Sequence, residues 1–180
     1  MTSSSEWVSV STPYLRPRPP GEPDAWTEEA TQQGRSGRQV LREVTEVEPP
    51  SHVAEAIKST AGDLVVVRRR IMLLDEHPVE LTDSYYPGFI ARGTPLAEPK
   101  KIPGGAITLL AELGYRSRHA HEDVSARPPS AQERQLLALG PDEWVLVLSR
   151  LVMADGSLPI EMSVMIMTAY GRHLRYQLTL

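Results

Sequence analysis

The chain has 180 residues, of which 41% are hydrophobic and 23% charged, and its formal net charge is −4. This composition is typical of one soluble globular domain and excludes a disordered chain, while the charge disfavours a surface that mainly binds nucleic acid. The absence of cysteine excludes disulfides, thiol nucleophiles and thiolate metal sites. No apolar run approaches the length that spans a bilayer and no signal peptide is apparent, so we expect a cytoplasmic protein without membrane contact.

The first 35 residues are expected to form a proline-rich arm and a short helix. The prolines from Pro13 to Pro23 each fix φ and remove a backbone donor, which predicts an extended or polyproline-like stretch. Trp7 is a candidate docking residue in this arm, because an exposed tryptophan is a poor choice for a free tail. Asp24 is the expected N-cap of a helix that ends at Gly34.

Residues 36–180 are expected to form one α+β domain in which β-hairpins dominate. The turn and capping signals predict helices that begin at Ser51, Gly104 and Ser130, the last with a capping box. Apolar and β-branched runs predict strands at 40–47, 64–74, 79–86, 116–127, 144–153, 158–167 and 174–180. This order of elements favours an antiparallel β-sheet covered by helices on one face.

Two of the predicted hairpins resemble each other. Each has an arginine in its first strand, an aspartate at the turn and a Pro-(Val/Ile)-Glu sequence after it, from Arg70 to Glu80 and from Arg150 to Glu161. Antiparallel hairpins share some of these features by strand propensity alone. The repeated arginine and glutamate predict a pseudo-symmetric sheet, with either two related pockets or one pocket between the halves.

Four sequence blocks in order carry a resemblance to a known family. Val65 to Pro87 resembles the first block of the UTRA (UbiC transcription regulator-associated) domain, the effector-binding domain of HutC-type regulators in the GntR family of transcription regulators. Lys100 to Tyr115 is similar to its helix block, and Ala126 to Leu139 and Val145 to Glu161 are similar to its closing blocks. The resemblance implies a chorismate lyase-like fold, a small polar or anionic effector, signalling through dimer or partner rearrangement, and a homodimer.

Family members normally carry a winged helix-turn-helix domain ahead of this one. The first 35 residues are too short and too rich in proline for such a domain, so we expect a stand-alone sensor or a truncated regulator. A stand-alone sensor would act through a partner, such as a DNA-binding regulator, and Trp7 in the arm is a candidate for that contact.

The resemblance also indicates candidate effector-binding residues. Arg70 is the first, because the family often places an effector-facing arginine here and its planar guanidinium suits carboxylates and phosphates. Gly105, Ala106 and Thr108 match a turn before a helix that contributes to effector binding in the family. Glycines there let a ligand approach backbone N–H groups closely. A solvent-exposed charge and an ordinary glycine loop are the alternative interpretations.

Strand alternation adds further candidates. Thr82, Ser84 and Tyr86 share one face of a strand, and Glu161 and Ser163 share one face of another. They line a pocket or form a solvated face. Glu161 also matches a family position that often contacts polar groups of the effector.

No catalytic residue, cofactor or metal is predicted. His119 and His121 share a strand face, but the neighbouring carboxylates point the other way, which disfavours a metal site. The alternative function is a chorismate lyase-like enzyme acting on a small carboxylate, in which Arg70 and Glu161 would line an enclosed pocket.

Overall fold

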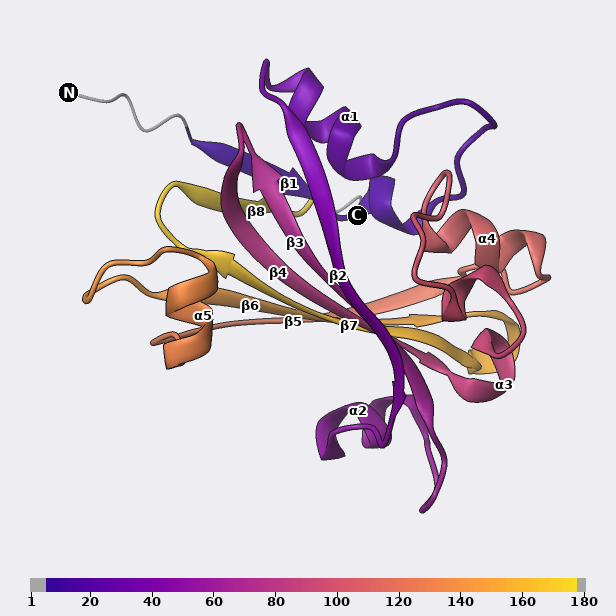
Figure 1. Cartoon of the computed structure of the whole chain (residues 1–180). Helices are drawn as coiled ribbons and strands as arrows, with labels where there is room; N and C mark the ends of the chain where they lie inside the picture. Colours follow the sequence, from indigo (N-terminus) through magenta and orange to yellow (C-terminus); the bar gives the residue numbers. More distant parts are fainter. Residues whose placement is uncertain (1–5, 178–180) are drawn as a thin grey trace.

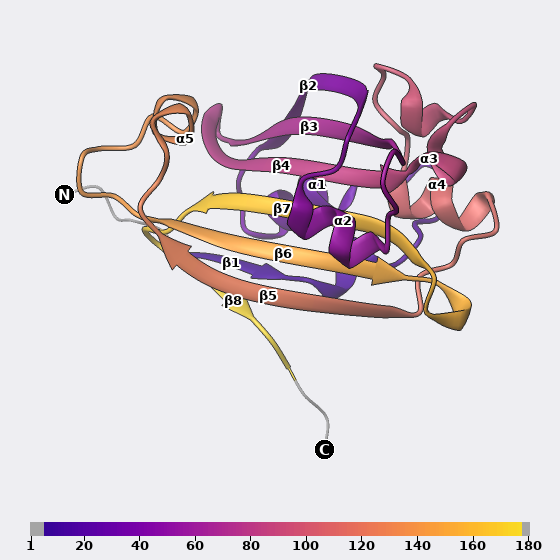
Figure 2. The same cartoon turned by 90° about the horizontal axis from the view of Figure 1, so that it is seen from below.

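The computed structural model describes residues 6–177 and is built around one antiparallel sheet of six strands. The strands lie in the order β2-β3-β4-β7-β6-β5, as Figure 2 shows from below. Their bounds are β2 (Gly37–Val47), β3 (Val65–Leu74), β4 (His77–Pro87), β5 (His119–Arg127), β6 (Val145–Met153) and β7 (Pro159–Thr168). The predicted α+β fold with an antiparallel sheet is therefore confirmed.

Helices cover both faces of the sheet, whereas the sequence predicted one covered face. In Figure 1, α1 and the small parallel sheet of β1 and β8 lie above the six strands, and α2 and α5 lie below. These elements and the remaining helices are β1 (Trp7–Val10), β8 (Arg172–Arg175), α1 (Ala25–Gln32), α2 (Ser51–Ile57), α3 (Gly88–Ala91), α4 (Ala106–Glu112) and α5 (Ala131–Leu136). None of these helices is long and apolar enough to cross a membrane.

Strand alternation explains the two covered faces. Val65 and Val67 of β3 are buried against Val53 of α2, while Val66 between them packs in the opposite cluster with Leu110 of α4. Because side chains of a strand point alternately to opposite faces, the apolar run of β3 requires cover on both sides. A strand sequence that is apolar at every position, without alternation, therefore indicates a sheet covered on both faces.

Two tight turns fix the register of the two predicted hairpins. Asp75 and Glu76 connect β3 to β4 with φ of 49° and 63°, so the turn has two residues and not the four predicted. Two consecutive left-handed residues match the right-handed twist of the strands. A 3₁₀ turn at Asp155–Ser157 connects β6 to β7. Because β4 pairs with β7, the two hairpins lie side by side.

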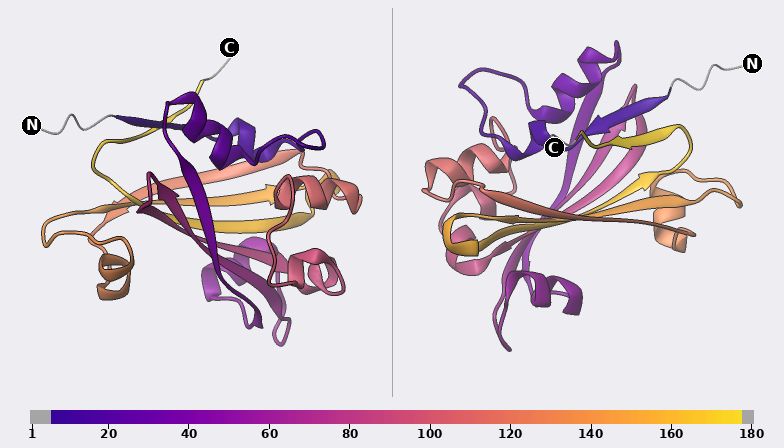
Figure 3. Two further views of the ribbon diagram at one scale, coloured as in Figure 1. Left: turned by 45° about the horizontal axis from the view of Figure 1, so that its top comes forward. Right: turned by 180° about the vertical axis from the view of Figure 1, so that it is seen from behind.

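The arm folds back onto the domain and docks through Trp7, and residues 16–23 form no helix or strand, in agreement with the extended stretch predicted from Tyr14 to Pro23. Trp7 is buried beside Trp26 of α1, with ring centroids 5.4 Å apart, and β1 pairs with β8 from the other end of the chain (Figure 3). A 3₁₀ helix at Thr12–Leu15 follows, and Pro13 fits its first turn because N–H groups there have no intrahelical acceptor. The tryptophan is therefore part of the core of this chain.

Smaller differences concern helix and strand ends. Asp24 caps α1 as predicted, by accepting a hydrogen bond from the Thr27 backbone, and Ser130 forms the predicted capping box. Pro50 and not Ser51 precedes the first residue of α2. The predicted last strand at 174–180 begins at Arg172 in the structure, and its final residues, 178–180, lie outside the described part.

Candidate functional site

A cavity of about 110 Å³ lies on the face of the sheet covered by the arm and α1. Strands β3, β4 and β7 form its floor, the start of α4 forms one wall, and residues of the arm close another. Seven of the nine predicted site residues line it, namely Arg70, Thr82, Tyr86, Gly105, Ala106, Glu161 and Ser163. The other two, Ser84 and Thr108, contact residues of this wall and floor without lining the cavity.

Arg70 and Glu161 are joined through two hydroxyl groups. The Nη2 of Arg70 donates to Ser84 Oγ at 2.7 Å, the two serine Oγ atoms of Ser84 and Ser163 are 2.8 Å apart, and Ser163 Oγ donates to Glu161 Oε1 at 2.9 Å. Since Ser163 gives its only hydroxyl proton to the carboxylate, Ser84 donates to Ser163. All donors then point from the guanidinium to the carboxylate, and each bond polarises the next.

The guanidinium of Arg70 keeps donor capacity that the protein does not use. Its Nε is buried and has no hydrogen-bond partner, and no carboxylate within residues 6–177 forms an ion pair with it. A buried donor without a partner is rare and costs free energy unless a ligand or water satisfies it. Arginine presents its donors in a planar fork that matches carboxylate and phosphate groups. Arg70 can therefore take an anionic group that enters the cavity.

The two neighbouring arginines have structural contacts instead. Arg68 lies on the same face, and its guanidinium donates to the backbone carbonyls of Leu96 and Glu98, both at 2.8 Å, so it anchors the loop before α4. Burial lowers its pKa. Arg69 points to the opposite face and pairs with Glu43 and Asp83. This division agrees with the sequence expectation that Arg70 is the ligand candidate of the three.

Tyr86 and Thr82 complete the polar floor of the cavity. Burial, together with the neighbouring Glu161 carboxylate, raises the pKa of Tyr86 well above its ordinary value, so its phenol stays neutral. Thr82 is buried and donates to Glu80 Oε1 at 2.7 Å. The floor thus offers a carboxylate, neutral hydroxyls and a cationic donor, a set that recognises a polar ligand with an acidic group.

The turn before α4 presents backbone to the cavity. Gly104 and Gly105 adopt φ of 71° and 86°, a region that side-chain-bearing residues rarely enter, and Gly105 and Ala106 line the cavity. Thr108 is turned away, because its hydroxyl donates to the Gly104 carbonyl at 2.8 Å and accepts from the Arg18 backbone N–H at 3.0 Å. Its position favours a role in holding the arm over a direct ligand contact.

Sequence reasoning did not assign to the site the cavity residues that the arm and β6 supply. Arg150 of β6 was noted only as part of the hairpin echo, and its guanidinium pairs with Glu122 of β5. The arm residues were treated as an extended segment outside the site. The missed residues that line the cavity include Pro13, Tyr14, Arg16, Arg18 and Arg150.

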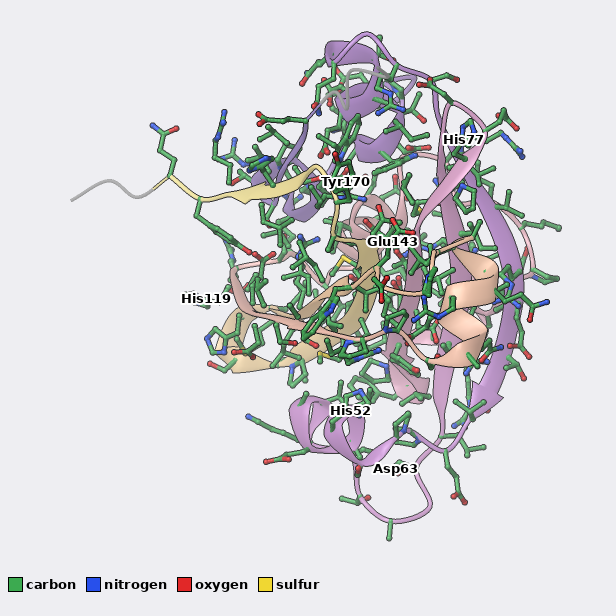
Figure 4. The ribbon with its side chains drawn as sticks, turned by 90° about the vertical axis from the view of Figure 1, so that its left-hand side faces the viewer. His52, Asp63, His77, His119, Glu143 and Tyr170 are labelled. Carbon is green, nitrogen blue, oxygen red and sulfur yellow. The ribbon has the colours of Figure 1, made fainter. Side chains whose placement is uncertain are left out.

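The histidines take no part in the site. His52, His77 and His119 lie on separate parts of the molecule, and His119 is exposed on β5 (Figure 4). Among residues 6–177, no three histidine, aspartate or glutamate side chains are grouped so as to hold a metal ion.

Comparison with known proteins decides the family. The model of the UTRA domain matches residues 32–170. This chain belongs to the UTRA domain family. Membership makes it a ligand-sensing regulatory domain of the kind found in GntR-type transcription regulators, which confirms the family and the general function predicted from the sequence blocks.

A curated relative shares sequence with the UTRA domain described above. The chain is 34% identical over 135 residues to an uncharacterized HTH-type transcriptional regulator from Streptomyces coelicolor. The match covers 72% of this chain and 50% of the relative. The chain thus spans about half the length of the curated relative it matches.

Two solved structures share the UTRA fold at low identity. The effector domain of PhnF from Mycobacterium smegmatis is 18% identical with a TM-score of 0.75, and the match covers 89% of this chain and 98% of that one. A putative GntR-family transcriptional regulator is 20% identical with a TM-score of 0.81, and the match covers 96% of this chain and 69% of that one. The second match is longer than residues 32–170, so the fold it shares includes part of the chain outside the family match.

Proposed function

We propose that this UTRA domain binds a small metabolite with an acidic group in the cavity over β3, β4 and β7, and that Arg70 holds that group. The observation that carries the proposal is that Arg70 lines the cavity while its buried Nε has no partner within residues 6–177. Glu161, Ser163 and Thr82 would accept or donate hydrogen bonds to the polar part of the same ligand. Ser84 and Tyr86 support them from the floor.

We also propose how the signal leaves the domain. The domain acts in the cytoplasm as a homodimer, and its output reaches DNA through a DNA-binding regulator, because the net charge of −4 disfavours direct contact with nucleic acid. Strands β2 and β5 form the two edges of the six-stranded sheet, and unpaired strand edges favour association. Light scattering of the purified chain, with and without ligand, tests the dimer.

The binding experiment is a thermal-shift screen against organic acids, sugar phosphates and amino-acid derivatives. A ligand present at about 100 times its dissociation constant should stabilise the fold by roughly 2.7 kcal/mol. The stabilisation should disappear in Arg70→Gln and persist in Arg42→Gln, a matched change at an exposed arginine that does not line the cavity. Stabilisation that survives Arg70→Gln would contradict the proposed site.

The alternative function, a chorismate lyase-like enzyme, makes a different prediction for the same ligand. Arg70 and Glu161 line the same cavity, which is the observation that keeps this alternative testable. A sensor returns its ligand unchanged, whereas an enzyme converts it. Mass spectrometry of each hit after prolonged incubation with the protein should recover the intact ligand, and a ligand-derived product would favour the enzyme.

A further inference from the structure

The first hairpin places three polar groups in a fixed arrangement. Arg70 of β3 lies directly opposite Thr82 of β4, and the Thr82 hydroxyl donates to Glu80, two residues earlier in β4, at 2.7 Å. All three side chains point to the face that holds the cavity, and all three line it. This arrangement is one arginine, one hydroxyl opposite it and one glutamate beside the hydroxyl.

The second hairpin repeats this arrangement. Arg150 of β6 lies directly opposite Ser163 of β7, and the Ser163 hydroxyl donates to Glu161, two residues earlier in β7, at 2.9 Å. These three side chains line the same cavity as the first three. The two related halves therefore share this cavity, which is one of the two alternatives left open by the sequence.

Arg70 and Arg150 differ in the partners of their guanidinium groups. Arg150 pairs with Glu122, its Nη2 donates to Ser11 of the arm at 3.1 Å, and its guanidinium lies 5.7 Å from the centroid of the Tyr14 ring. Arg70 has only Ser84 as a side-chain partner among the described residues. The arm thus occupies the half of the cavity around Arg150 and leaves the half around Arg70 for a ligand.

The same arm segment also reaches the ligand half of the cavity. We call residues 11–18 the strap. Arg18, at its end, lines the cavity, and its side chain is only 9% exposed. Its terminal nitrogens donate to the Pro23 carbonyl and to Glu28, but its buried Nε has no partner within the described residues. Two arginines that line one cavity, Arg70 in the sheet and Arg18 in the strap, therefore each have a buried Nε without a partner among the described residues.

We propose that the strap is part of the effector site, and that an anion bound at Arg70 is held from the other side by Arg18. The proposal rests on the proposed function of the cavity and extends it to the arm. Ligand binding then secures the strap over the cavity, since the ligand gains the Arg18 contact only when the strap is docked. By linkage, docking of the strap must strengthen ligand binding by the same factor.

The contacts of the strap explain how it docks before a ligand arrives. Tyr14 donates to Glu29 of α1 at 2.9 Å, Ser11 donates to Glu122 at 2.9 Å, and the Arg18 backbone N–H donates to Thr108. These contacts tie the strap to three separate elements, so a ligand that adds one more contact changes the docking equilibrium of the whole segment. The strap lies between β1 and α1 in the chain, so a ligand that secures the strap also affects how these two elements are held.

The test uses inorganic phosphate as the probe anion, measured by calorimetry on four forms of the full chain. Arg18→Gln should weaken phosphate binding about tenfold, because a hydrogen bond to a charged group is lost. Arg70→Gln should abolish it, and Arg42→Gln, which removes the same charge at an exposed site, should leave it unchanged. Hydrogen exchange supplies a second readout: phosphate should slow exchange at the Arg18 amide in the wild type but not in Arg70→Gln.

The outcomes separate this inference from the proposed function. Equal affinity of Arg18→Gln and the wild type, with binding still lost in Arg70→Gln, overturns the role of the strap and leaves the site at Arg70 intact. Unchanged exchange at the strap under saturating phosphate overturns it as well. No phosphate binding by the wild type overturns the anion site and, with it, the inference built on it.

Discussion

The two halves of the cavity share one sequence pattern, but only one of them has a carboxylate paired with its arginine. Arg150 faces Glu122 across β5 and β6, whereas the residue that faces Arg70 across β2 and β3 is Leu41. In the half around Arg150, Glu122 neutralises the guanidinium, which also contacts the arm. The other keeps a cationic group unpaired. The comparison teaches that a single residue on the outer strand decides whether a repeated arginine stabilises the fold or binds a ligand.

A second difference lies in the floor between the halves. Ser84 connects Arg70 to Ser163 and so to Glu161, while the position related to Ser84 in the second hairpin is Met165. A thioether cannot relay such a hydrogen bond, so the second half has no chain of donors from its arginine to its glutamate. Arg150 instead contacts β5 and the arm.

The largest expected effect comes from breaking the ion pair between Arg150 and Glu122. Glu122→Gln removes the carboxylate from a pair whose side chains are only 8% and 10% exposed, and it leaves a buried guanidinium without its partner. We expect a loss of about 3 kcal/mol in the free energy of unfolding at pH 7, measured by urea denaturation. Asp123→Asn, an exposed change next in sequence, is the matched control. A loss below about 1 kcal/mol would contradict the importance of the pair.

The same variant has a defined pH dependence. Burial alone would raise the pKa of Glu122, but the Arg150 guanidinium and hydrogen bonds, including one from Ser11, hold it below its ordinary value. A carboxyl with a lowered pKa in the folded state stabilises the protein above its unfolded pKa and loses that contribution as the pH falls. The stability difference between wild type and Glu122→Gln should therefore shrink on acidification. A difference that grows would contradict this assignment.

The next largest effect is expected when a carboxylate is placed opposite Arg70, so that this half resembles the half around Arg150. Leu41→Glu places a carboxylate opposite Arg70, as Glu122 stands opposite Arg150. The new carboxylate should pair with Arg70 and weaken phosphate binding at least about tenfold in calorimetry. Leu41→Gln, which has similar size and no charge, is the control and should retain binding. Equal loss in both variants would indicate a disturbed cavity and no competition for Arg70.

A smaller effect is expected in the floor. Ser84→Ala removes the hydroxyl that hydrogen-bonds both Arg70 and Ser163 and so connects these two side chains. We expect a loss of about 1 kcal/mol in the free energy of unfolding, typical of one hydrogen bond, together with weaker phosphate binding because Arg70 loses its positioning contact. Unchanged stability and unchanged binding would contradict the donor chain.

The smallest effect belongs to the opposite face. Arg69→Gln breaks pairs with Glu43 and Asp83, but the Arg69 side chain is 32% exposed, so the stability change in urea denaturation should stay within about 1 kcal/mol. Phosphate binding should not change, since Arg69 does not line the cavity. Any loss of binding would mean that charge on either face matters and would weaken the special role of Arg70.

Much of the sheet could be predicted from the sequence, because strand alternation and turn residues are local signals. The two hairpins and the caps at Asp24 and Ser130 follow from them. That Arg70 and Glu161 share a cavity was expected only from the family resemblance. The arm could not be predicted, since docking of Trp7 depends on contacts with α1 and β8 that no local pattern encodes. Whether each of the two arginines has a carboxylate partner depends likewise on the residue of the outer strand that faces it.

The most direct test of the unpaired arginines is an NMR titration of the arginine Nε–H signals with inorganic phosphate. Signals of Arg70 and Arg18, assigned from the Gln variants, should shift together and give one dissociation constant. Signals of Arg68 and Arg150, whose guanidinium groups are already engaged by protein acceptors, should shift little. If Arg70 does not respond while phosphate shifts other arginines, the cavity around Arg70 is not an anion site and the account is wrong.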